Sequence, residues 1–67
     1  MEKFSAMLKE LREEKGLSIP QMSKQSGIPE KSIHNWERGE RSPNLESILI
    51  LCKFFKCSPN LLLGYEM

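Results

Sequence analysis

The sequence is poor in the residues that build disulfides and metal sites. Its 67 residues include two cysteines and one histidine. Cys52 and Cys57 are spaced so that their side chains leave a helix in different directions, and we expect no disulfide between them. A zinc site would have to combine both thiols with His34 and a carboxylate, at none of the usual ligand spacings. We therefore expect no metal and no other cofactor.

Long apolar runs and catalytic motifs are also missing. No segment approaches the roughly 18 apolar residues that span a membrane, and the N-terminal stretch MEKFSAMLKE lacks the apolar region of a signal peptide. We expect a cytoplasmic protein without a membrane partner. The chain has no glycine-rich phosphate loop and no pair of acids converging from separate elements, and it is too short to enclose a pocket. We expect neither an enzyme nor a small-molecule ligand.

An excess of one charge is absent as well. Ten Lys and Arg stand against nine Asp and Glu, a net charge of +1, whereas free-standing nucleic-acid binders are often strongly basic. Hydrophobic residues make up 39% and charged residues 28%, which are ordinary globular proportions. The chain should fold as one domain over residues 1–67. Any binding to a polyanion must depend on where single charges lie.

What the sequence does contain is a series of helix signals. Apolar residues recur at helical spacing near the start, at Phe4, Met7, Leu8 and Leu11. They predict a first helix over about 2–15 that ends at Gly16. Ser18 then has the features of an N-cap, with Pro20 in the first turn and Gln21 completing a capping box. This predicts a second, short helix that ends at Ser26-Gly27.

Three further helices are predicted. Residues 29–38 form the third, with Ile33 and Trp36 on its inner face. The fourth opens with Ser42 or Asn44 as its cap, and a fifth short helix follows the cap Ser58. The inner stripe expected for the fourth helix consists of Leu45, Ile48, Leu49, Cys52 and Phe55. Two short helices joined by a glycine-containing turn have the proportions of a helix-turn-helix.

The segments LKELREEKGLS, GIPEKSIHNWERGERSPNLESI and FFKCSPNLLLG resemble the phage Cro/repressor-type (XRE) helix-turn-helix DNA-binding family over about residues 4–64. Residues at family spacing are Leu17-Ser18, Gly27-Ile28, Ile33, Trp36-Glu37-Arg38-Gly39 and Ser42-Pro43. The resemblance implies an all-α, compact five-helix lambda-repressor-like domain with its third helix in the major groove of DNA. The chain departs from the family at Ile19, where a phosphate-binding glutamine is usual, and at Ser23, where alanine is favoured.

In such a domain the first turns of the third helix read base edges, and they hold Glu30, Lys31, His34 and Asn35. Lys31 can donate to guanine O6 and N7, Asn35 can pair with adenine, and Glu30 can accept from cytosine N4. Simple solvent exposure is the alternative for each, most evenly balanced for Glu30 and His34. Trp36 is expected in the core, its indole N–H reaching a polar edge.

Phosphate contacts are expected at the start of the second helix and in the loop after the third, because helix N-termini and loop cations attract anions. The candidates are Ser18, Gln21, Arg38, Arg41 and Ser42. A capping box alone would also account for the first two, and a solvated charge for Arg41. The resemblance further implies a structural ion pair between Arg12 and Glu37.

Ile50 and Phe54 lie outside the expected inner stripe and should be exposed, forming an apolar patch with Leu61. Such a patch usually marks a partner surface, although burial by the fifth helix is the alternative. We therefore expect a homodimer that binds a palindromic operator and acts as a repressor or Cro-like transcriptional regulator. The alternative is a protein-interaction or antitoxin-type adaptor on the same fold, favoured by Glu30 and Ile19, since neither attracts phosphate.

Overall fold

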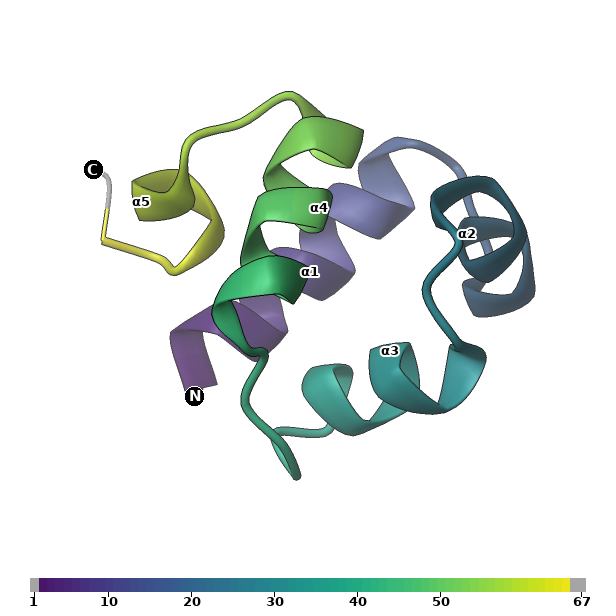
Figure 1. The fold of residues 1–67 in the computed structure, drawn as a ribbon, viewed down its shortest axis with the longest axis horizontal. Helices are drawn as coiled ribbons and strands as arrows, with labels where there is room; N and C mark the ends of the chain where they lie inside the picture. The colour runs from purple at the N-terminus through teal and green to yellow at the C-terminus, as the bar shows by residue number, and fades with distance from the viewer. Residues whose placement is uncertain (1, 66–67) are drawn as a thin grey trace.

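The computed structural model describes residues 2–65, and these residues form five helices. They are α1 (Glu2–Glu14), α2 (Ile19–Ser26), α3 (Glu30–Glu37), α4 (Leu45–Phe55) and α5 (Pro59–Leu62). The predicted all-α, five-helix architecture is confirmed. α3 lies along one edge of the molecule and packs against α1 and α2, while α4 packs against α5 and α2 (Figure 1). None of the helices in residues 2–65 is long and apolar enough to cross a membrane.

The helix ends follow the capping signals in the sequence. Ser18 Oγ accepts a hydrogen bond from Gln21 N at 3.2 Å, and Gln21 Oε1 accepts one from Ser18 N at 2.8 Å, so the capping box is complete. Gly27 ends α2 in the left-handed conformation at φ 80°, which a residue with a Cβ adopts at a cost. Asn44, rather than Ser42, caps α4, because its Oδ1 accepts from Ser47 N at 2.8 Å.

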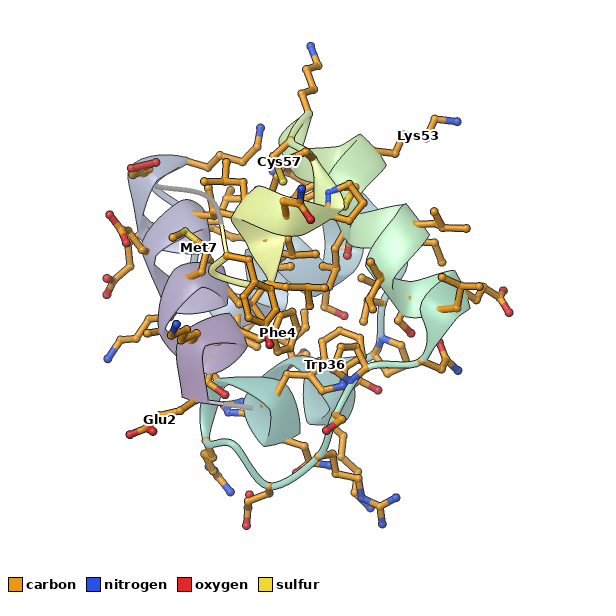
Figure 2. All side chains as sticks on the ribbon, turned by 90° about the vertical axis from the view of Figure 1, so that its left-hand side faces the viewer. Glu2, Phe4, Met7, Trp36, Lys53 and Cys57 are labelled. Atoms are coloured by element: carbon orange, nitrogen blue, oxygen red, sulfur yellow. The ribbon has the colours of Figure 1, made fainter. Side chains whose placement is uncertain are left out.

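One core holds the helices together. Its buried residues come from every helix and from the α2–α3 turn, and they are Phe4, Leu8, Met22, Ile28, Ile33, Trp36, Leu51 and Leu62. The rings of Phe4 and Trp36 meet edge to face, with centroids 6.2 Å apart, and join α1 to α3 (Figure 2). Cys52 and Cys57 are half-buried thiols that are not bonded to each other. Residues 2–65 contain no cluster of side chains suited to a metal ion.

The orientation of α4 differs from the sequence-based expectation. Leu45 and Leu49 were expected to face the core, yet they are 73% and 57% exposed. Leu51, which the expected stripe omitted, is fully buried, and Phe54 is half-buried against the core instead of exposed. The core-facing stripe is Ile48, Leu51, Cys52, Phe54 and Phe55. α4 is apolar around most of its circumference, so helical periodicity does not single out one face.

Candidate nucleic-acid interface

The inner side of α3 is fixed to the rest of the molecule. Ile33 is fully buried and Trp36 is 6% exposed. Ser5 on α1 donates a buried hydrogen bond from its hydroxyl to the main-chain carbonyl of Trp36. A hydrogen bond in the interior is electrostatically stronger than one in water, and this contact joins α1 to the last turn of α3. α3 is therefore held in place by its inner face, and its outer face makes none of these contacts.

An ion pair completes the attachment of α3. Arg12 Nε lies 2.7 Å from Glu37 Oε2, and Arg12 Nη2 lies 3.0 Å from Glu37 Oε1. The third arm of the guanidinium donates to the carbonyl of Leu17 at 2.7 Å, so Arg12 also holds the α1–α2 loop. The hydrogen bonds and charge of Glu37 raise the pKa of Arg12, against the opposing effect of desolvation. The implied ion pair is present, and the bond to Leu17 is an addition that the sequence did not indicate.

The opposite side of α3 carries the residues expected to contact bases. Glu30 and Lys31 are exposed in its first turn, and His34 and Asn35 are half-buried one turn later. Lys31 ends in three donors, Asn35 has both a donor and an acceptor, and Glu30 has only acceptors when ionised. The face therefore combines hydrogen-bonding groups of both kinds on a short rigid helix of eight residues.

The N-terminus of α2 leaves donors available after its internal bonds are made. The capping box uses the Gln21 side-chain oxygen and the Ser18 hydroxyl oxygen as acceptors. The Gln21 side-chain amide and the Ser18 O–H remain as donors on an exposed surface, and these are the groups that a phosphate oxygen accepts from. Ile19, by contrast, is half-buried and packs against the core.

The loop after α3 carries two arginines. Arg38 ends α3, and Arg38, Arg41 and Ser42 are all exposed. Arg38 Nη1 lies 3.5 Å from Glu40 Oε1, with both side chains more than half exposed, at 64% and 56%. This weak ion pair was not predicted from the sequence, although Arg38 and Glu40 are opposite charges two positions apart in a turn. Glu40 therefore competes with any phosphate for Arg38.

The residues expected at a dimer interface lie in different environments. Ile50 is 38% exposed, whereas Phe54 and Leu61 are half-buried. The ammonium of Lys15 lies 5.2 Å from the centre of the Phe54 ring, so part of that ring is covered from within the chain. The exposed apolar side chains of α4 are instead Leu45, Leu49 and Ile50.

α2 and α3 are two short helices joined by a three-residue turn. α3 packs against the rest of the molecule on its inner side and is accessible to solvent on its outer side. This arrangement defines a helix-turn-helix unit. The model of the helix-turn-helix family matches residues 8–62. The chain belongs to this family of DNA-binding transcriptional regulators, in its XRE or phage-repressor branch.

The chain is similar to three curated regulators. It is 35% identical over 63 residues, 94% of its length, to the HTH-type transcriptional activator BcrR of Enterococcus faecalis. It is 39% identical over 46 residues, 69% of its length, to repressor protein C2 of Salmonella phage P22. A putative HTH-type transcriptional regulatory protein of Thermococcus kodakarensis is 37% identical over 49 residues, 73% of the chain. The chain spans 31%, 21% and 15% of these relatives. No solved structure matches it.

Proposed function

We propose that this protein binds double-stranded DNA sequence-specifically by laying α3 in the major groove, and that it controls transcription in this way. The observation that carries the proposal is the two-sided environment of α3. Its inner side is immobilised by Trp36, Ser5 and the Arg12–Glu37 pair, and its outer side presents Glu30 and Lys31 to solvent. A rigid polar helix of this kind fits the major groove by width and by hydrogen-bonding chemistry.

Each polar residue of α3 has a role in the proposal. Lys31 donates to O6 and N7 of guanine, Asn35 pairs with the edge of adenine, and Glu30 accepts from N4 of cytosine. His34, half-exposed between them, contacts a base edge or the adjacent backbone. Each good base contact contributes about 1–3 kcal/mol of discrimination.

Phosphate contacts position α3 in the groove. The Ser18 hydroxyl and the Gln21 amide bind one phosphate at the start of α2, and Arg38, Arg41 and Ser42 follow the backbone on the other side of α3. With a net charge of only +1, sequence-independent affinity should be modest. Base contacts should therefore supply a large share of the specific binding.

Binding as a homodimer to a palindromic operator completes the proposal. Two copies of α3 about 34 Å apart would enter successive major grooves on one side of the duplex. The curated relatives comprise a protein named an activator and another named a repressor, and a repressor or Cro-like role is our proposal for this chain. A protein that acts on DNA works in the compartment that holds it, so the cytoplasmic location belongs to the same proposal.

Selection of bound sites from random duplexes, repeated over a series of salt concentrations, tests this function. We expect a consensus of two inverted half-sites, with affinity that falls as salt increases because bound phosphates release counterions. Binding without any preferred sequence would contradict the proposal. Absence of binding at low salt would favour the adaptor function instead.

A further inference from the structure

The solvent side of α4 carries a stripe of four exposed residues with an unusual order of charge. Glu46, Leu49, Ile50 and Lys53 stand at helical spacing, i, i+3, i+4 and i+7, and all four are exposed. They lie on the side of α4 opposite the core-facing stripe that contains Leu51. Figure 2 shows Lys53 projecting away from the body of the molecule. We call these four residues the α4 stripe.

The apolar residues of the α4 stripe are only partly covered by the described chain. Leu49 and Ile50 are 57% and 38% exposed, and the neighbouring Leu45 is 73% exposed. Neither Glu46 nor Lys53 forms an ion pair with another residue of 2–65. Their seven-residue separation, about 10 Å along the helix, also keeps them from pairing with each other. Leu49 and Ile50 lie between the two opposite charges, and Leu45 lies beside Leu49 one turn earlier; such a group of exposed aliphatic side chains is typical of a partner surface rather than of scattered surface residues.

Along α4 the stripe runs from an acid through two apolar residues to a base. A second copy of α4 in the reverse direction therefore presents a complementary order of charges. If a second copy of α4 packs antiparallel across a two-fold axis between Leu49 and Ile50, the apolar side chains of both copies meet at the centre. Glu46 of each copy then lies opposite Lys53 of the other, giving two equivalent ion pairs. A parallel arrangement would instead place Glu46 against Glu46 and Lys53 against Lys53. The charges therefore favour a second copy in the antiparallel orientation.

We infer that the α4 stripe is the self-association surface of this protein and that two copies pack α4 against α4 in antiparallel orientation. The inference rests on the homodimer of the proposed function, and it replaces Phe54 and Leu61 with Leu49 and the two flanking charges. A stable interface buries about 800 Å² per partner, whereas this one is centred on a single 11-residue helix of a chain with 4579 Å² of accessible surface. The association is therefore weak and concentration-dependent.

Sedimentation equilibrium of the wild-type chain and three charge variants tests the inference. The wild type should form dimers reversibly as its concentration approaches the millimolar range. Glu46→Lys and Lys53→Glu should each weaken association roughly tenfold, because two exposed pairs change from attraction to repulsion. The double variant Glu46→Lys/Lys53→Glu should recover association, and a mixture of the two single variants should associate more tightly than either variant does alone. The matched controls Lys9→Glu and Glu10→Lys, at exposed positions on α1, should associate like the wild type.

Helix stability separates this result from simple damage to α4. Both single variants oppose the helix dipole, since Glu46 is in the first turn and Lys53 in the last. The double variant carries both penalties and should have the lowest melting temperature, so recovered association cannot come from recovered stability. A monomeric wild type, single variants that associate like the wild type, or a mixture that stays monomeric would each overturn the inference.

The same variants also distinguish a failure of the interface inference from a failure of the proposed DNA function. Binding to a random-sequence duplex at low salt, at protein concentrations below dimer formation, uses α3 and not α4. If DNA binds and the charge variants leave association unchanged, the interface inference fails and the DNA function stands. If association follows the charges but no duplex binds, the DNA function fails and the interface inference stands.

Discussion

The guanidinium of Arg12 and the carboxylate of Glu37 form two hydrogen bonds, of 2.7 and 3.0 Å, between residues 25 positions apart in sequence. Both side chains are largely buried, at 12% and 9% exposed. Arg12 also binds the carbonyl of Leu17, so one side chain connects α1, the α1–α2 loop and the end of α3. The orientation of the helix that we propose to read DNA therefore depends on a contact outside the DNA-facing surface.

Replacing Arg12 with methionine should destabilise the fold by about 2–4 kcal/mol, because the Glu37 carboxylate is left without its partner in a poorly solvated place. Urea denaturation measures this loss. Glu40→Gln is the matched control, since it breaks the exposed pair with Arg38, and it should change stability by less than about 0.5 kcal/mol. If Arg12→Met and Glu40→Gln change the free energy of unfolding equally, the prediction that the Arg12–Glu37 pair stabilises the fold is contradicted.

Glu40→Gln should also raise affinity for DNA. The exposed Glu40 carboxylate lies 3.5 Å from Arg38 and would repel a nearby phosphate. Its removal frees Arg38, and we expect affinity for duplex DNA to rise roughly three- to tenfold at low salt, with the difference shrinking as salt is added. Fluorescence anisotropy with a labelled duplex measures it. Glu10→Gln on α1 removes the same charge away from α3 and should have a smaller effect; equal gains would mean that only net charge matters.

Lys56→Gly should stabilise the protein. Lys56 ends α4 in the left-handed region, at φ 54° and ψ 49°, where a residue with a Cβ costs about 1–2 kcal/mol. Glycine removes that strain but adds freedom to the unfolded chain, so the expected gain is about 0.5–1 kcal/mol in thermal or urea unfolding.

Gly27→Ala is the opposite test. Gly27 has φ 80° with nothing within 4 Å of an added Cβ, so alanine meets no clash and only the backbone conformation opposes it. We expect a loss of about 1 kcal/mol. A stability gain at Gly27, or a loss at Lys56, would contradict the assignment of strain to these two caps.

Much of the fold could be predicted because the capping signals are local. Ser18, Gln21 and Gly27 decide where α2 begins and ends through bonds within a few residues, and the structure has those bonds. The choice between Ser42 and Asn44 as the cap of α4 was open, since both have suitable side chains. Backbone geometry decided it in favour of Asn44.

The rotation of α4 could not be predicted for a different reason. A helix faces the core with the stripe that packs best against its neighbours, and α4 has apolar residues on most sides. Leu51 rather than Leu49 is buried because of how α4 meets α2 and α5, and this depends on side chains distant in sequence. The contact between Lys15 and Phe54, which joins the turn after α1 to α4, could not be predicted for the same reason.

Arg41→Ala tests the division between positioning and reading. Arg41 is exposed in the loop after α3, where we propose a phosphate contact. Its removal should weaken binding to all sequences alike and lower the slope of log affinity against log salt by about 1. Salt titrations on two unrelated duplexes measure both effects. A loss confined to one duplex would instead make Arg41 a base-reading residue.

The most direct test of the central claim, that the outer face of α3 reads DNA sequence, is to compare the sites selected from random duplexes by the wild type and by Lys31→Ala. Lys9→Ala, which removes an exposed lysine from α1, is the control. We predict that Lys31→Ala relaxes the preference at one base pair of each half-site and leaves the other positions unchanged, while Lys9→Ala selects the wild-type sequence. An unchanged consensus for both variants, or equal weakening at every position, would contradict the account.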